Sequence, residues 1–228
     1  MAKILQIETA TQTCSVALAI AGETIALKEE TAKNIHAGSL TLFIKEVMQQ
    51  AGLQYQDLDA VAVSKGPGSY TGLRIGISTV KGLCFALDKP LIAIDTLKMM
   101  ANGFLLENTG YTGLICPMID ARRMEVFTAL FNEALEMVAP VTAKIIEADS
   151  YTAELTAHQI TFIGDGASKC SEVLHHPNAI FSAENFNSSA HLSKLAIAAY
   201  EQQEFEDVAY FEPYYLKDFV FTAPKKKV

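Results

Sequence analysis

An apolar strand, a glycine-rich loop and a helix follow one another within the first half of the chain. Residues 60–64 read AVAVS, and the next residues read KGPGSYTGLRIG. Gly66 and Gly68 permit positive φ and close approach of other backbone, and the N–H groups at a helix start favour an anion. Gly72 and Gly76 lie four residues apart on one helix face, where a neighbouring helix can pack closely. The pattern predicts an α/β fold, with this loop as either a tight structural turn or an anion site.

The predicted elements occur in the same order in both halves of the chain. Each half reads as strands, helix, strand, helix, strand and helix, which predicts a duplicated α/β unit. We expect lobes at residues 1–104 and 105–205 and a C-terminal segment at 206–228. The expected strands are residues 3–8, 14–20, 24–30, 60–64, 91–94, 114–120, 125–131, 144–147, 160–163 and 179–181. The expected helices include residues 36–51, one ending near 87, one capped by Asp149 and running to 157, and 189–201.

The composition is that of a globular protein with little affinity for nucleic acid. Half of the 228 residues are apolar, and the formal net charge is −8. Because binding to phosphates depends on Lys and Arg, we expect a partner to hold any RNA on which this chain acts. No basic region precedes a long apolar stretch at the N-terminus, and no window approaches ~18 continuous apolar residues. We therefore expect a cytoplasmic protein without membrane contact.

The four cysteines and the basic end of the chain have simple structural explanations. Cys14, Cys84, Cys116 and Cys170 form no C-x-x-C pair, and each lies in an apolar run, so we expect buried free thiols. Residues 224–228 (PKKKV) are faintly similar to a nuclear localisation signal, but a solvated chain end explains them more simply.

Two amphipathic helices have apolar stripes that suit either the core or a partner. In residues 36–51 the apolar positions are spaced by three and four, and the helix after the glycine-rich loop repeats this pattern. Leu42, Ile75, Phe85 and Ala86 lie outside the stripes, so neither helix is apolar on one face alone. The stripe residues considered for a partner interface are Leu40, Phe43, Ile44 and Val47 in the first helix, and Gly72, Leu73, Gly76, Ile77, Val80 and Cys84 in the second.

Five segments spread over the chain resemble the TsaB (YeaZ) family. GPGSYTGLRIG is very similar to that family's GPGSFTGLRIG signature, and IETATQTCSVAL resembles its first strand and hairpin. HAGSL at residues 36–40 resembles a helix start of the family. DARRMEVF at 120–127 resembles its D-A-R-R-G-E-V-Y motif, and PYYLK at 213–217 resembles its C-terminal P-x-Y-L-R. The resemblance implies the actin-like ATPase (ASKHA) fold with two ribonuclease-H-like lobes, in agreement with the duplicated order of elements.

The resemblance also implies a function without chemistry of its own. TsaB proteins are non-catalytic subunits required for threonylcarbamoyl transfer to adenosine 37 of tRNA (t6A formation), and they pair through these two helices with the catalytic paralogue TsaD. The ATPase TsaE joins a larger complex, TsaC makes the adenylate intermediate upstream, and tRNA is reached only through the complex. The resemblance implies that this chain has no cofactor of its own. ATP or ADP and a metal are expected in the partner or at the joint interface. A homodimer is the alternative state of the isolated chain.

Two positions argue against catalysis by this chain. TsaD holds a metal with an H-x-x-x-H pair, and the matching positions here are Thr96 and Met100. A hydroxyl and a thioether cannot replace two imidazoles as ligands of iron or zinc. None of the five histidines has the H-x-x-x-H spacing. We therefore expect no metal site and no catalytic residue.

The ends of the predicted strands resemble a nucleotide cleft that has lost its function. Active members of the actin-like class hold magnesium-nucleotide with an Asp at the end of the first strand, whereas this chain has the longer Glu8. The corresponding acid in the second half is Asp120, and GDG at 164–166 is short for an adenosine loop. The residues of this vestigial cleft are Glu8, Thr9, Thr11, Gly66, Gly68 and Asp120.

Three rival functions stay open at this point. A small kinase or ATPase of the actin-like class would turn over magnesium-nucleotide by itself. A metallopeptidase, a label that the wider family has carried, would need the histidine pair that this sequence lacks. A self-associating scaffold would form homodimers through the same two helices.

Overall fold

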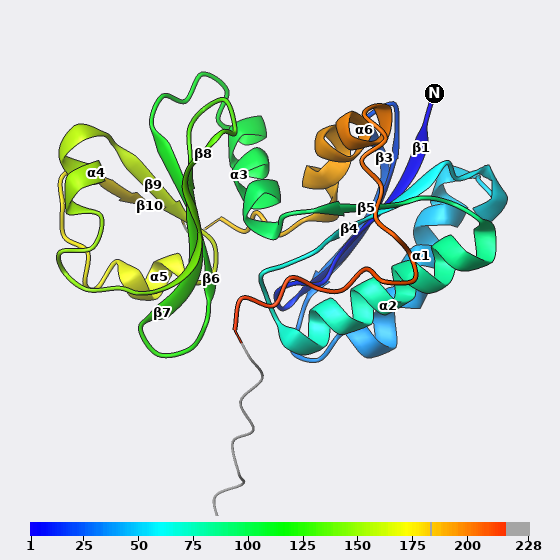
Figure 1. Cartoon of the computed structure of the whole chain (residues 1–228), viewed down its shortest axis with the longest axis horizontal. Coiled ribbons are helices and arrows are strands. Elements are labelled where there is room, and N and C mark those ends of the chain that lie inside the picture. Colours follow the sequence, from blue (N-terminus) through cyan, green and yellow to red (C-terminus); the bar gives the residue numbers. More distant parts are fainter. Residues whose placement is uncertain (183, 218–228) are drawn as a thin grey trace, which may run out of the picture.

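The computed structural model describes residues 1–182 and 184–217 as two α/β lobes that lie side by side (Figure 1). Each lobe is built on a five-stranded sheet. All four cysteines are buried free thiols, as predicted. Among the described helices, none has the length and apolar character needed to cross a membrane. The basic stretch at residues 224–228 lies outside the described residues.

The sheet of the first lobe has the strand order β3-β2-β1-β4-β5. Strands β1, β4 and β5 are parallel, while β2 is antiparallel to both of its neighbours. Helices α1 and α2 pack on one face and α6 on the other, so β1 is buried on both sides. The bounds are β1 (Lys3–Glu8), β2 (Thr13–Ile20), β3 (Glu23–Thr31), α1 (His36–Ala51), η1 (Tyr55–Asp57), β4 (Ala60–Ser64), α2 (Tyr70–Leu87), β5 (Leu91–Ile94), η2 (Ser189–Leu192) and α6 (Ser193–Glu201).

The sheet of the second lobe repeats this order, because β8-β7-β6-β9-β10 has the same pairing pattern. Helices α4 and α5 pack on one face, and α3 packs on the face turned toward the first lobe (Figure 1). The duplicated unit and the α/β class predicted from the sequence are confirmed. The bounds are α3 (Thr96–Glu107), β6 (Leu114–Asp120), β7 (Glu125–Phe131), β8 (Met137–Ile145), α4 (Thr152–Ala157), β9 (Ile160–Ile163), α5 (Ala167–Cys170) and β10 (Ala179–Phe181).

Caps fix the ends of the helices. Gly52 ends α1 with φ +67°, and the Ser69 hydroxyl accepts the Gly72 N–H at the start of α2. The predicted side-chain cap at Asp149 is wrong. The residue before α4 is Tyr151, in a left-handed conformation, and no side chain caps that helix.

Three predicted boundaries differ from the structure. Strand β8 begins at Met137 rather than at residue 144, because the hairpin after β7 is tight and pairing resumes between Phe131 and Met137. Helix α3 extends to Glu107, so the expected boundary at residue 104 falls inside a helix. Helix α6 packs on the first sheet, through Ala196 and Ala199, although it follows the second lobe in sequence.

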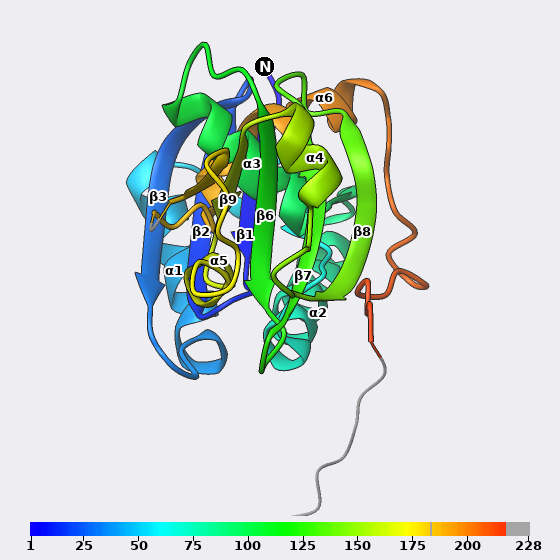
Figure 2. The same cartoon turned by 90° about the vertical axis from the view of Figure 1, so that its left-hand side faces the viewer.

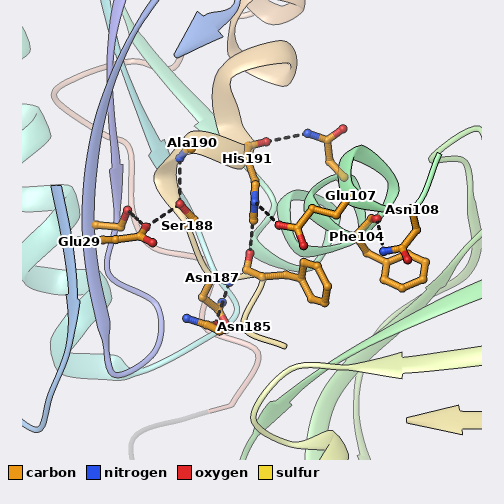
Figure 3. A network of polar contacts seen from close by, with 12 residues as sticks. Glu29, Phe104, Glu107, Asn108, Asn185, Asn187, Ser188, Ala190 and His191 are labelled. Carbon is orange, nitrogen blue, oxygen red and sulfur yellow. Dashed lines mark hydrogen bonds and ion pairs between the residues drawn. The ribbon is translucent and has the colours of Figure 1, made fainter. Parts of the chain in front are cut away.

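The chain crosses between the lobes at α3 and returns after β10, and the two crossings bind each other (Figure 3). Asn102 Nδ2 donates to the backbone oxygen of His191 at 2.7 Å, and the His191 ring lies 2.9 Å from the Phe186 oxygen. His191 Nε2 lies 3.7 Å from the Glu107 carboxylate. The Phe104 and Phe186 rings meet edge to face with centroids 5.6 Å apart. These contacts hold the returning segment against α3.

The returning segment is also held to the first sheet by hydroxyl groups. Ser188 and Ser15 both donate to Glu29 Oε2, at 2.7 and 2.9 Å. The Ser189 N–H donates to the Ser15 hydroxyl at 2.9 Å. Figure 3 shows this row of contacts between strand β3 and the segment that leads into α6. Buried hydroxyls that pair with each other and with a carboxylate satisfy their hydrogen-bonding needs without water.

The contact between the crossings depends on the small size of Gly103. A Cβ at this position would overlap the ring of His191, which is itself held by Phe186. We expect Gly103→Ala to lower the free energy of unfolding by about 1–3 kcal/mol, the usual range for overpacking. Chemical denaturation followed by circular dichroism measures the change.

The matched control is Gly38→Ala in α1, where an added Cβ meets open space. It should be neutral or stabilise by up to about 1 kcal/mol, the helix-propensity difference. Equal effects of the two substitutions would contradict the packing of His191 on Gly103.

Candidate functional site

The turn after β1 lies directly on the start of α2. A Cβ added at Gly68 would overlap Ala10, and one added at Gly72 or Gly76 would overlap Thr9. The glycines of the loop and helix are therefore required for this close packing. Of the two explanations for the glycine-rich loop, the structure favours the tight structural turn.

Hydrogen bonds fix the same contact. Thr9 Oγ1 donates to the Gly72 oxygen at 2.8 Å, and the Ser69 N–H donates to the Ala10 oxygen at 2.6 Å. The carbonyl of Ala10 thus takes the place at the loop where an anion would bind an N–H group. On the other side of the turn, the His36 ring lies 2.7 Å from the Thr11 oxygen. The predicted cleft residues of the first lobe are brought together, and their polar groups mostly bind neighbouring residues, while Glu8 Oε2 has no hydrogen-bond partner among the described residues.

Glu8 at the end of β1 is completely buried, with 0% of its surface exposed. Its Oε1 accepts the Ala10 N–H at 2.5 Å. Burial raises the pKa of the Glu8 carboxyl from 4.5 to about 7, against the smaller lowering effects of Ser64 and the Ala10 N–H. A carboxyl with this pKa is a poor ligand for magnesium-nucleotide, because it is half protonated near neutral pH.

Asp120 at the end of β6 lies on the other side of the cleft. Unlike the buried Glu8, its carboxylate is neutralised by an ion pair. Its carboxylate forms an ion pair with Lys169 and accepts the Arg122 N–H at 2.9 Å. The same lysine donates to the Glu125 oxygen at 2.7 Å, which fixes its ammonium group beside Asp120. Asp165 accepts the Asp120 N–H, and burial raises the pKa of the Asp165 carboxyl. A lysine therefore stands where a strand-end acid would hold a cation.

Thr96 and Met100, which occupy the positions of the histidine pair, are core residues with 0% exposure. Thr96 bonds to the glycine-rich loop: its hydroxyl accepts the Gly66 N–H at 3.1 Å, and its own N–H donates to the Gly66 oxygen at 3.0 Å. The Met100 side chain packs against Gly164 in the second lobe. Over the part of the chain that the structure describes, no three His, Cys, Asp or Glu side chains come together as a metal site.

The stripe residues considered for a partner interface lie in the core of the first lobe. None of the eight side chains is more than 6% exposed, and both glycines are buried against the β1 turn. A partner cannot reach them on the surface, because the stripes pack on the sheet. The prediction that these residues contact a partner is wrong, and only exposed positions of the same helices are accessible to one. The residues affected are Leu40, Phe43, Ile44, Val47, Gly72, Leu73, Gly76, Ile77, Val80 and Cys84.

The exposed positions of α2 form a face of small residues next to a large one. Thr71, Ser78 and Gly82 are exposed, Arg74 is exposed between the first two, and Phe85 follows with 85% of its surface in solvent. An added Cβ at Gly82 meets open space, so the chain's own packing does not require a glycine here. A shallow cavity of about 530 Å³ lies between Gly82, Phe85 and residues 207–209.

The sequence predicted a separate C-terminal segment at residues 206–228 but not its course. We call its described part, residues 206–217, the C-terminal strap. It runs back along α2 from the end of α6 toward the space between the lobes (Figure 1). The Lys81 ammonium donates to the Phe211 oxygen at 2.8 Å, and the Tyr214 N–H donates to the Lys65 oxygen at 2.8 Å. Its one sequence signal was the PYYLK motif, which carries no strand or helix period.

The end of the strap joins the two lobes. The Tyr215 ring stacks on Tyr70 of α2, with centroids 4.1 Å apart and planes at 4°. Arg74 Nε donates to the Tyr215 hydroxyl at 3.0 Å. Two residues later, Lys217 forms an ion pair with Glu125 of β7 in the second lobe. Figure 2 shows the strap running down the right-hand side of the view, from α6 toward its end.

Two lobes with this repeated strand order, facing each other across their strand ends, define the actin-like ATPase class of folds. A family model described as "TsaD: tRNA N6-adenosine threonylcarbamoyltransferase" matches residues 24–225. The solved structure of YeaZ from Pseudomonas aeruginosa superposes with a TM-score of 0.83 at 28% identity, covering 95% of this chain and 100% of that one. A dehydratase activator from Clostridium difficile, with a TM-score of 0.52 at 9% identity, is similar in fold alone.

Curated relatives agree with the structural match. The Bacillus subtilis tRNA threonylcarbamoyladenosine biosynthesis protein TsaB is 37% identical over 141 residues, 60% of this chain and 59% of that relative. The Haemophilus influenzae protein of the same name is 27% identical over 94% of this chain and 93% of its own length. The chain thus spans less than two thirds of the Bacillus subtilis relative in that alignment. The chain belongs to the family that the TsaD model describes and, within it, to the TsaB (YeaZ) group.

The burial of Glu8 should make the stability of the chain depend on pH. Because its pKa is higher in the folded chain than its ordinary 4.5, loss of the proton opposes folding. The penalty is absent below about pH 4.5, grows up to about pH 7 and stays constant above it. We expect Glu8→Gln, which keeps the acceptor for the Ala10 N–H, to be more stable than the parent chain by about 3 kcal/mol at pH 8. Urea unfolding measured from pH 4 to pH 8 tests this.

The control is Glu133→Gln in the exposed turn after β7, which should leave stability unchanged at every pH. If the difference in stability between Glu8→Gln and the parent chain were the same at pH 8 and at pH 4, the Glu8 carboxyl would be solvated in the folded state.

Proposed function

We propose that this chain is a non-catalytic subunit required for threonylcarbamoyl transfer to adenosine 37 of tRNA, and that it acts by pairing with a TsaD-type catalytic subunit. The names of its relatives associate them with threonylcarbamoyladenosine biosynthesis. The family model carries the name of the transferase itself. The proposal thus assigns the chemistry to the partner and the supporting surface to this chain.

The observation that carries the proposal is the closed contact between the β1 turn and α2. The loop N–H group of Ser69 is bound to Ala10, and the strand-end acid Glu8 is buried. Lys169 occupies the cation position beside Asp120. These contacts support the proposal that this chain does not bind a nucleotide by itself. ATP or ADP and a metal belong, in this proposal, to the partner or to the joint interface.

The exposed face of α2 supports pairing with another helix. An exposed glycine within a helix lowers helix stability by about 1 kcal/mol relative to alanine. Gly82 has no neighbour that explains its missing side chain. Small side chains at this face let the backbone of a second helix approach closely, and the exposed Phe85 ring offers apolar area at its end. Leu42 of α1, 57% exposed, adds apolar surface on the adjoining helix.

The wider assembly follows from the same proposal. TsaE would join the pair as its ATPase, TsaC would supply the adenylate intermediate upstream, and tRNA would be bound through the complex. A homodimer through the same helices is the alternative state of the isolated chain. Light scattering with and without the TsaD-type partner separates the homodimer from the heterodimer.

Omission and restoration of this chain test the function. In a reconstituted system with the TsaD-, TsaE- and TsaC-type proteins, we expect t6A formation to stop without the chain and to return when it is added. Mass spectrometry of nucleosides from digested tRNA measures the product. Equal modification with and without the chain would remove the proposed role.

Substitution of Gly82 tests the pairing surface. We expect Gly82→Arg to weaken binding of the TsaD-type partner at least about tenfold, because a long charged side chain separates the two helices. Gly82→Ala should stabilise the isolated chain by about 0.5–1 kcal/mol, since it removes the glycine penalty without a clash. Calorimetry measures the affinity, and thermal melting measures the stability.

The control for Gly82→Arg is Ala153→Arg on the exposed side of α4 in the second lobe. It adds the same charge to a helix far from α2 and should leave pairing unchanged. Loss of pairing in both variants, or in neither, would contradict the assignment of this face.

The rival function is an active ATPase or small kinase of the same fold. The buried Glu8 and the Lys169–Asp120 ion pair oppose it. We expect calorimetry of the isolated chain with magnesium-ATP to show no micromolar binding and no turnover. Hydrolysis by the purified chain alone would favour the rival.

A further inference from the structure

The arginines of the chain are few and lie near one another. Of 18 basic residues, only Arg74, Arg122 and Arg123 are arginines. Arg122 and Arg123 form the turn between β6 and β7, directly after the strand-end Asp120. Arg74 lies in the second turn of α2, just after the glycine-rich loop. All three are thus close to the strand ends that face the cleft.

The strap brings the three arginines to one rim. Arg74 bonds to Tyr215, and Glu125 pairs with Lys217. Tyr215 and Lys217 are two residues apart, so their Cα atoms are at most about 7 Å from each other. The start of α2 and the β6–β7 turn therefore lie on either side of the same short piece of chain. Figure 1 shows both near the end of the strap. We call Arg74, Arg122 and Arg123 the arginine rim.

The backbone at Arg122 and Arg123 is unusual for these residues. Both have positive φ, 73° and 53°, a region that favours glycine or asparagine. The turn is held by the Arg122 N–H on Asp120, and by the Glu125 N–H on the Arg122 oxygen. Both side chains are exposed, and no acidic group among the described residues pairs with either. The fold thus presents two guanidinium groups at a strained turn without using them internally.

The two acids that flank the β6–β7 turn already have lysine partners, while Asp165 binds the Asp120 N–H. Asp120 pairs with Lys169, and Glu125 pairs with Lys217. The Arg74 guanidinium carbon lies 4.8 and 5.7 Å from the centroids of the stacked Tyr70 and Tyr215 rings, and Arg74 also lacks an acidic partner in the part of the chain described. The rim therefore carries a local excess of positive charge in a chain whose formal net charge is −8.

We propose that the arginine rim binds the phosphodiester backbone of a folded RNA that the assembled complex holds against this chain. The inference rests on the proposed function, which supplies an RNA substrate. Planar guanidinium groups bind phosphate oxygens in a bidentate manner, which the more numerous lysines cannot do. Three cations on an acidic protein neutralise too few phosphates to bind RNA alone, so the contact orients an RNA that the partner also binds.

The experiment measures the affinity of the assembled complex for tRNA as a function of salt, with Arg122→Gln/Arg123→Gln in place of the parent chain. Each lost phosphate contact should lower the slope of log affinity against log salt by about 1. We expect the double variant to lose about two units of slope and to bind tRNA at least about tenfold more weakly near 0.1 M salt. Arg122→Lys/Arg123→Lys should restore most of the slope but not all of the affinity.

The matched control is Lys3→Gln/Lys89→Gln, which removes the same charge at the opposite ends of the strands of the first sheet, at the start of β1 and shortly before β5. It should leave the slope unchanged. Gel filtration and circular dichroism of the double arginine variant show whether the chain still folds and assembles. An unchanged slope and affinity in an intact complex would overturn the proposal. If the double arginine variant no longer assembles with one of the proteins while tRNA binding is unchanged, the proposal is also overturned. That result would indicate that the rim binds an acidic surface of that protein.

The two proposals fail in different ways. If the parent chain is dispensable for t6A formation, the proposed function is wrong whatever the rim does. If the parent chain is required but the salt slope does not depend on Arg122 and Arg123, only the inference about RNA is wrong.

Discussion

The close packing of the β1 turn on α2 organises the first lobe and the cleft. Gly68, Gly72 and Gly76 let Thr9 and Ala10 approach the helix at backbone distance. The same contact places Gly66 where Thr96 can bond to it, so the start of α3 is joined to the loop. Three elements from distant parts of the sequence therefore meet at one point. A side chain in place of any of these glycines would separate them.

The acids at the strand ends of the two lobes are compensated by different physical means. In the first lobe, Glu8 is removed from water and its pKa is raised toward neutrality. In the second lobe, Asp120 stays half exposed, but Lys169 supplies the positive charge that a metal would otherwise bring. Desolvation acts on one acid and ion pairing on the other. One strand-end acid is therefore buried with a raised pKa, and the other has a lysine as its partner.

Much of the fold could be predicted from the sequence, because strands and helices have periods that one segment reveals by itself. The short, mainly apolar run of β1 and the spacing of Leu40, Phe43, Ile44 and Val47 are local properties. Whether that stripe packs in the core or contacts a partner is not a local property, because it depends on which face of the helix meets the sheet. The return of α6 to the first sheet and the course of the strap also depend on distant contacts. For the cleft, the sequence indicated which residues gather there, but not that Lys169 pairs with Asp120.

The return of α6 to the first sheet also has a consequence for how the polypeptide acquires its shape during synthesis. Residues 114–181 contain every strand of the second sheet, so this lobe can assemble as soon as it has left the ribosome. The first sheet is made much earlier, yet the face that holds Ile4 and Ala60 stays uncovered until residues 193–201 have been synthesised. The lobe whose synthesis begins first is therefore the one completed last.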